Sequence, residues 1–516
     1  MHRIQIRRIA QRRNCWACLS VGMTGVALTP AAKRICVLLF LALNFLFLIT
    51  SSGRVRTIDE VSVDLQTESL ALHGNTAVPQ AEALGTFYGK RDRWGQPRAP
   101  YGTAQAVLVL PWHFAGRMSR AVLPGIPARA KDLFLDAVVA SSSATFAALG
   151  AALAFLIFCR MGMDVKPALW AALILALATP LFAYSAWFFS EPLVAVLLLA
   201  AALVLFTGEA ETPIPPKLAA IAGIFLGVSL WVRPSHLIAA PVFFLALLIR
   251  DRKKGLAAAF TLAVVVGIFG GAYLVRNEIY FGNPVEFGYP DVAEGGRHLN
   301  TFRTPLVTGL FGFLLSPGKS VFLFAPPIVL AIAGLRRLWK RDAGLAVVAA
   351  GLPVIYLLFF ARYTQWEGGY CVGPRYLVPA LVALCLGLGP MLAEAGPRVR
   401  KLAVVLFVAG VLVQVISIST SFLEDQATGR YYDAQWNYRM EYSSITRQGR
   451  LFLHYVTTSQ PVPIGLGFDR WFVFLGKAGV SRGLLAAGLC VEVAGLFFSG
   501  WRLKKAISLT TGSVSH

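Results

Sequence analysis

The sequence predicts an all-α polytopic membrane protein with about twelve transmembrane helices and a long first external loop that carries interfacial helices. Hydrophobic residues make up 56% of the 516 positions, charged residues only 14%, and the mean hydropathy is +0.63. This composition is too apolar for a soluble enzyme with a single anchor. Lys and Arg gather where the apolar runs end, as membrane topology requires.

The strong positive charge is explained by topology and not by a nucleic-acid partner. The chain has 48 Lys and Arg against 26 Asp and Glu, a net charge of +22. In a soluble protein this excess would suggest nucleic-acid binding. Here the cations flank apolar runs, as they do in cytoplasmic loops. We therefore expect the membrane as a partner and no nucleic acid.

The first predicted span follows a basic segment, 1–34, which we expect to be a cytoplasmic tail ahead of an uncleaved helix. The main transmembrane region is 35–423, the first external loop within it is 51–131, and 479–516 holds the last helix and a cytoplasmic tail. The twelve predicted spans lie near 35–50, 133–159, 168–187, 192–207, 217–232, 236–250, 255–275, 321–337, 344–361, 376–395, 401–423 and 482–500.

The sidedness of the basic clusters supports this count. With twelve spans every cluster falls on the cytoplasmic side, and one span more or fewer would place later clusters outside. Both termini are then cytoplasmic. The clusters are Arg250, Arg252, Lys253 and Lys254; Arg336, Arg337, Lys340 and Arg341; Arg398, Arg400 and Lys401; and Arg502, Lys504 and Lys505.

Several external segments interrupt the apolar pattern. Tyr101–Leu123 is apolar but contains Pro111 and Trp112, which favours an interfacial or re-entrant piece over a full span. The segment 424–478 is polar and aromatic, with Tyr431, Tyr432, Trp436 and Trp471, and we expect a small external cap with little core of its own.

The sequence carries no signal for a nucleotide, a nicotinamide cofactor or a disulfide framework. We find no Walker loop, no strand–GxGxxG–helix unit and no HExxH pair. Of seven cysteines only Cys371 falls in a predicted external loop, and the single pair Cys15 and Cys18 is a weak metal or redox signal. We expect no cofactor, and a divalent metal has no support.

Three acids are candidates for chemistry. Asp59 and Glu60 lie just beyond the first span, where partial desolvation suits a general base. Taken alone, a solvated acidic pair at a helix start is the favoured interpretation, because Asp and Glu prefer the first turn. Glu191, held between two spans by Pro192, must face a cavity or a cation. As a second acid it would assist the base or orient the acceptor.

Several cations lie on the predicted external side, where Lys and Arg are disfavoured. Arg375 ends the Gly-rich loop Trp366–Arg375, and a guanidinium there can bind a lipid phosphate bidentately or simply anchor a helix end. Arg362, Arg276 and Arg233 share this unusual position, and Lys319 precedes a span. Around Tyr88, aromatic and basic side chains alternate, which suits either a sugar phosphate or lipid headgroups.

The order of these features resembles the GT-C superfamily of integral-membrane glycosyltransferases, and within it bacterial relatives of protein O-mannosyltransferases and lipid A aminoarabinose transferases. The resemblance covers roughly 35–420. It rests on the acid in the first external loop (Asp59, with Glu60), on Phe189-Ser190-Glu191, on the run from Tyr280-Phe281-Gly282-Asn283-Pro284 to Leu315-Ser316-Pro317-Gly318-Lys319, and on Trp366-Glu367-Gly368-Gly369 with Gly373-Pro374-Arg375-Tyr376.

The resemblance implies inverting transfer of a sugar from a polyprenyl-phosphate donor to a glycan, lipid or protein acceptor, outside the bacterial inner membrane. It assigns the acid–base chemistry to Asp59 with Glu60 and Glu191, and the donor phosphate to Arg375, Lys319 and Arg276. Substrate contacts would come from Trp366, Glu367, Tyr376 and Tyr88. The segment 424–478 matches no acceptor domain.

Two other functions stay open at this point. A transporter or lipid flippase also needs cations among broken helices, although the spans show no inverted repeat. A catalytically inactive scaffold would keep the helices and tolerate changes at the acids.

Overall fold

The computed structural model describes residues 28–206, 213–251, 255–290, 302–424, 434–458 and 466–512. Within these ranges the chain is almost entirely helical, with one antiparallel ribbon of β1 (Lys90–Arg91) and β2 (Pro97–Arg98). The predicted all-α polytopic class is confirmed. Most of the basic tail with Cys15 and Cys18, the cations at 252–254, and Tyr431 and Tyr432 lie outside the described residues.

Seven helical segments of the described chain are long and apolar enough to cross a membrane. They are α2 (Pro30–Thr50); η2 (Ala128–Ala130) with α7 (Lys131–Ala140) and α8 (Ser142–Arg160); α14 (Gly255–Phe281); α18 (Ala343–Arg362); η4 (Arg375–Leu377) with α19 (Val378–Leu384), η5 (Cys385–Gly387) and α20 (Leu388–Ala393); α21 (Pro397–Ser419); and α25 (Arg482–Gly512).

The other predicted spans are shorter or broken helices. Proline explains the breaks, because it lacks an N–H and starts a helix more readily than it continues one. Pro180 separates two helices within the run 168–187, and Pro326 and Pro327 do so within 321–337. These helices are α9 (Val165–Leu177), α10 (Pro180–Ser185), α11 (Glu191–Phe206), α12 (Pro216–Val232), η3 (Pro234–Ile238), α13 (Ala239–Arg250), α16 (Val321–Phe324) and α17 (Ile328–Arg341); α15 (Leu306–Leu315) was not predicted.

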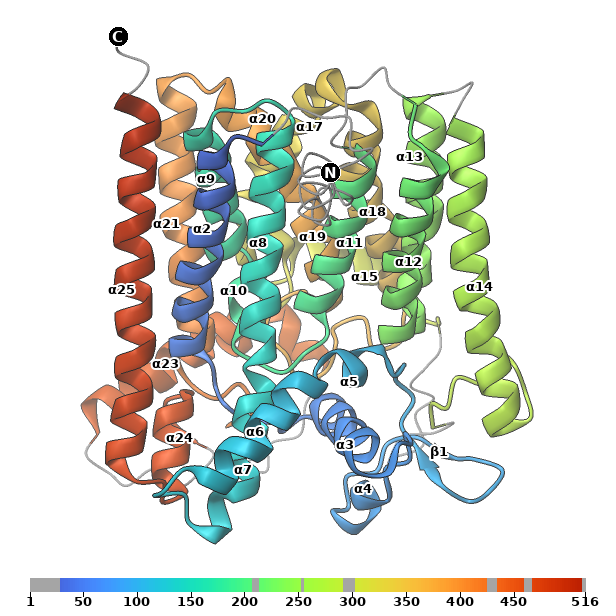
Figure 1. Ribbon diagram of the computed structural model, residues 1–516, viewed down its shortest axis with the longest axis vertical. Coiled ribbons are helices and arrows are strands. Elements are labelled where there is room, and N and C mark those ends of the chain that lie inside the picture. The colour runs from blue at the N-terminus through green and yellow to red at the C-terminus, as the bar shows by residue number, and fades with distance from the viewer. Residues whose placement is uncertain are drawn as a thin grey trace, which may run out of the picture.

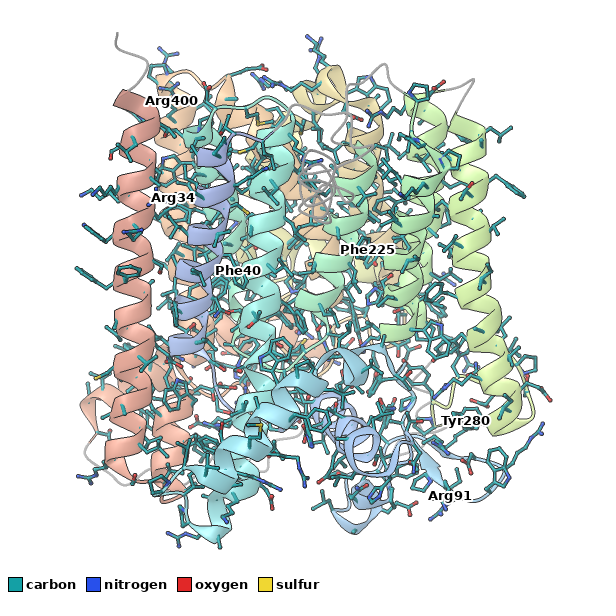
Figure 2. The ribbon with its side chains drawn as sticks, viewed as in Figure 1. Arg34, Phe40, Arg91, Phe225, Tyr280 and Arg400 are labelled. Carbon is teal, nitrogen blue, oxygen red and sulfur yellow. The ribbon has the colours of Figure 1, made fainter. Side chains whose placement is uncertain are left out.

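The helices stand side by side as a bundle with two distinct ends (Figure 1). Arg34 and Arg400 lie towards one end, and Arg91 and Tyr280 lie at the other (Figure 2). We call the end with Arg91 and Tyr280 the site end. The predicted first external loop lies there as α3 (Ile58–His73), α4 (Pro79–Ala83), α5 (Ala104–Leu108) and α6 (Leu110–Val122). The Tyr101–Leu123 stretch therefore does not cross the bundle.

The later external segment is joined to the same end. Its described helices are η6 (Ala434–Tyr438), η7 (Met440–Tyr442), α23 (Ser444–Thr457) and α24 (Trp471–Lys477). The Trp471 N–H donates to the Ser51 carbonyl at 2.9 Å, and Phe474 and Leu475 share a small apolar cluster with Ala130. The late external segment thereby packs against both ends of the first loop.

Candidate functional site

A capping box fixes the start of α3 and the direction of its two acids. Thr57 caps the helix, and its Oγ1 accepts the Glu60 N–H at 3.3 Å. The Glu60 carboxylate accepts the N–H groups of Arg56 (3.0 Å), Thr57 (2.9 Å) and Phe188 (3.0 Å). Glu60 is fully buried, and burial raises its pKa. It thus ties the helix start to the loop before α11, with no face towards a cavity.

Asp59, one residue earlier, points the other way and is surrounded by donors. Its Oδ2 accepts from Arg233 Nη2 at 2.8 Å and from Arg375 Nη2, and its Oδ1 accepts from the Tyr101 hydroxyl. Burial disfavours the charge, but Arg375, Arg233 and the Tyr101 hydroxyl outweigh burial and hold the pKa of Asp59 well below its usual range. Asp59 is therefore an anion, with 19% of its side chain exposed.

Arg375 connects Asp59 to the second acid. Its Nε donates to Glu191 Oε1 at 2.8 Å, and its guanidinium carbon lies 4.1 Å from the Phe189 ring centroid. The other Glu191 oxygen is buried and has no hydrogen-bond partner in the described part of the chain. Arg375 can reach this position because Gly368 and Gly369 take φ of 78° and 67°, which side chains other than glycine rarely adopt.

Arg233 completes the group of charges. It follows α12, donates from Nε to Ser190 Oγ at 3.1 Å, and stacks 4.6 Å from the Tyr101 ring centroid. The sequence grouped Arg233 with the other external cations as a possible anion site, but it was not among the residues assigned to the donor phosphate. Tyr101 was missed because it opens an apolar run. In the structure the neighbouring Gly102 packs against the end of α12, where a Cβ would lie 1.8 Å from the Trp231 carbonyl oxygen.

These charges line one side of a cavity of about 550 Å³ at the site end. The rest of its wall is mainly aromatic, a surface suited to sugar rings and isoprenoid chains. The aromatic lining residues are Tyr88, Tyr101, Phe287, Tyr289, Phe302, Phe359, Phe360, Tyr363, Tyr370 and Tyr376. His236 also lines the cavity, and its Nδ1 lies 2.9 Å from the Tyr356 hydroxyl.

Among the predicted site residues, the structure brings together Asp59, Glu191, Arg375, Tyr88 and Tyr376 around this cavity. Glu60, Lys319, Arg276, Trp366 and Glu367 do not line it.

The Lys319 Nζ donates to the Cys371 carbonyl at 2.9 Å and so holds the loop before Arg375. Arg276 donates to Asn277 at 3.0 Å and stacks on Tyr280. Trp366 packs against Phe313, and the Glu367 carbonyl accepts from the Cys371 thiol. In this structure these four residues contact the protein around the cavity and not the cavity itself.

A second buried ion group lies beside the first. Asp469 is fully buried and accepts from Arg56 (2.9 Å), Arg54 (3.1 Å) and the Trp187 indole (3.1 Å). Burial opposes its charge, but Arg56 and Arg54 outweigh burial and hold the pKa of Asp469 below its ordinary value. Because Arg56 also lines the cavity, this group links the late external segment to the cavity wall.

The described residues include no group of three or more His, Cys, Asp or Glu arranged to hold a metal ion. The expectation of metal-independent chemistry stays a prediction.

Comparisons with known proteins give structural similarity without sequence similarity. No protein-family profile and no curated protein sequence matches this chain. A crystal structure of ArnT from Cupriavidus metallidurans in the apo state is similar over 91% of this chain and 75% of its own, with 13% identity and a TM-score of 0.44. An archaeal oligosaccharyltransferase, AglB from Archaeoglobus fulgidus in complex with an inhibitory peptide and a dolichol-phosphate, is similar over 84% of this chain, with 14% identity and a TM-score of 0.46. The chain spans 60% of the length of AglB.

Proposed function

We propose that this protein is a glycosyltransferase that moves a sugar from a polyprenyl-phosphate donor to a cell-envelope acceptor, with inversion at the anomeric carbon. The observation that carries the proposal is the meeting of one carboxylate, Asp59, with two guanidiniums, Arg375 and Arg233, in one aromatic cavity. Such a transfer needs a base that takes the proton of the acceptor, and a cationic site that binds the leaving phosphate.

The two guanidiniums are suited to the donor phosphate. A planar guanidinium binds phosphate oxygens through parallel N–H bonds and keeps its charge at any physiological pH. Arg375 is fixed by Glu191 and Arg233 by Ser190, so both forks are oriented before a donor arrives. Preorganised donors of this kind stabilise the negative charge that develops on a leaving phosphate. The isoprenoid chain would lie against Phe302, Phe359 and Phe360.

Asp59 is suited to accept the acceptor's proton. The acceptor oxygen forms a bond to the anomeric carbon as its proton passes to Asp59. The bond from that carbon to the phosphate oxygen breaks, and polyprenyl phosphate leaves with the electron pair. In the empty site the guanidiniums hold Asp59 as a weak base. A bound phosphate competes for the same N–H groups, so donor binding would release Asp59 and make it more basic.

The remaining contacts fit this division of labour. Glu191 donates no proton to the reaction in this proposal, and we assign it to orienting Arg375 through the hydrogen bond between Arg375 Nε and Glu191 Oε1. The rings of Tyr88 and Tyr376 would stack on sugar faces. We place the protein in the bacterial inner membrane with the site end outside, because the basic clusters would then be cytoplasmic.

The test compares cells that lack the gene with cells carrying the wild-type gene, Asp59→Asn or Arg362→Lys. The last is a control at an exposed arginine that does not itself line the cavity. Envelope glycolipids and glycoproteins are measured by mass spectrometry. We expect one sugar modification to vanish without the gene and with Asp59→Asn, and to return with the other two. A normal product with Asp59→Asn at wild-type protein levels would reject the proposal. Gene-dependent uptake of a solute into proteoliposomes that lack lipid-linked sugar would favour a transporter instead.

A further inference from the structure

A second cavity, of about 750 Å³, lies at the end of the bundle opposite the site end. It is formed by residues of α9, α20 and α21 and of the loops beside them, together with Thr510 near the end of α25. One of its lining residues, Arg400, is visible at that end of the bundle (Figure 2). The proposed glycosyl transfer makes no use of it.

The walls of this cavity are apolar and deep. Ile174, Leu392 and Ala403 are buried, and Ala403 leaves room that a larger side chain would fill. Trp170 is 49% exposed although it packs edge-on against Phe407, with 5.8 Å between ring centroids. A half-exposed tryptophan beside a hydrocarbon-like wall is typical of the membrane interface.

The rim of the cavity is charged. Lys166 and Arg400 are exposed, as is Asp164. In the described part of the chain neither cation forms an ion pair. Two cations and one acid leave the rim with a single positive charge. An apolar cavity with a cationic rim at the end of membrane helices matches a lipid chain with one negative headgroup charge.

We propose that this cavity binds an anionic glycerophospholipid with one negative charge, such as phosphatidylglycerol. An acyl chain lies against Trp170 and Val404, and Lys166 and Arg400 bind the headgroup phosphate. A bound lipid would fill the space between α9 and α21 and so support the helices on the side away from the site. This inference does not depend on the proposed glycosyl transfer.

The test counts lipids on the purified full-length protein by native mass spectrometry, with phosphatidylglycerol and phosphatidylcholine as probes. Lys166→Glu and Arg400→Glu reverse the rim charges. Arg398→Glu is the matched control, because it reverses an exposed charge on the same helix outside the cavity. We expect phosphatidylglycerol affinity to fall about 25-fold for each rim variant, because each reversal changes the rim by two charges, and to stay unchanged in the control. Phosphatidylcholine binding should be unaffected throughout.

A steric variant gives an independent readout. Val404 lines the cavity and is 52% exposed, so Val404→Trp fills the space without disturbing buried packing. It should abolish tight phosphatidylglycerol binding with an unchanged unfolding temperature in detergent. Equal loss in Arg398→Glu, equal affinity for phosphatidylcholine, or retention of phosphatidylglycerol in Val404→Trp would each overturn the proposal. Displacement of phosphatidylglycerol by stoichiometric polyprenyl phosphate would also overturn it, by naming a different occupant.

Discussion

Asp59 and Glu60 are adjacent in the chain, yet their side chains face different surroundings. Asp59 faces the cavity, where it accepts from two guanidiniums and one hydroxyl. Glu60 faces the protein interior and accepts three backbone N–H groups. The helix start separates them, because successive residues of a helix point about 100° apart. Asp59 thus faces the cavity, and Glu60 joins the start of α3 to the loop before α11.

Substitution of the two acids should separate activity from stability. We expect Asp59→Asn to lower the rate about 10²- to 10⁴-fold, the usual contribution of a general base, with near-normal folding. Glu60→Gln replaces one carboxylate oxygen by an NH2 group, which then faces at least one backbone N–H donor, and should destabilise the protein by about 1–3 kcal/mol. Product formation and thermal unfolding in detergent, measured on both variants, check this. Inactivity of Glu60→Gln at full stability would contradict it.

Arg375→Lys keeps the charge beside Asp59 but removes the planar fork. Lysine cannot donate to Asp59 and Glu191 with the same geometry, so we expect normal membrane insertion and about a 10²- to 10³-fold lower rate. Turnover with saturating donor is the measurement. Arg362→Lys, an exposed arginine at the end of α18, is the control. Equal activity of both variants would reduce Arg375 to a helix anchor.

The pH profile should differ between free and donor-bound enzyme. In the empty site the pKa of Asp59 is depressed, so Asp59 is ionised above its ordinary value of about 4 and loses charge only below it. The acid limb of kcat/KM, which reports free enzyme, should therefore lie below about pH 4. The acid limb of kcat, which reports the donor-bound protein, should lie at a higher pH. The donor phosphate would bind the guanidiniums and so raise the pKa of Asp59. Coincident limbs would contradict this exchange.

Tyr101→Phe provides a matched variant for the same measurement. The Tyr101 hydroxyl donates to Asp59 and helps to depress its pKa. Its removal should move the acid limb of kcat/KM upward while Arg233 and Arg375 remain in place. An unchanged limb would mean that the guanidiniums alone set the ionisation of Asp59.

The helical class and the approximate positions of the spans could be predicted from sequence, because hydropathy reports burial in lipid directly. The breaks in the spans were harder to place. Pro180 and the pair Pro326 and Pro327 lie inside apolar runs, where window averages hide them. The ten-residue helix α15 was missed for a related reason, since it is too short to give a span signal.

Within the site, the predicted residues that line the cavity include charged residues with an unusual position in the sequence. Glu191 and Arg375 were singled out because a charge at the outer end of a span is unusual. Asp59 was singled out by its place just beyond the first span together with the family resemblance. Lys319 and Arg276 gave the same signal, and only side-chain packing separates them from the cavity, by contacts with Cys371 and Tyr280. Tyr101 could not be found this way, because an aromatic residue at the start of an apolar run is ordinary.

Asp469→Asn should destabilise the site end more than any exposed charge substitution. Asp469 neutralises Arg54 and Arg56, so its loss leaves two buried cations and should cost about 3–5 kcal/mol. Thermal unfolding in detergent measures this. Glu394→Gln is the control, because Glu394 is 46% exposed and surface ion pairs contribute little.

The folded-state pKa of Asp469 is depressed, so its stabilisation is complete above about pH 4 and is lost as pH falls through the folded value. The gap between wild type and Asp469→Asn should therefore narrow in acid. A gap that is constant with pH would mean that the aspartate acts through shape and not through charge.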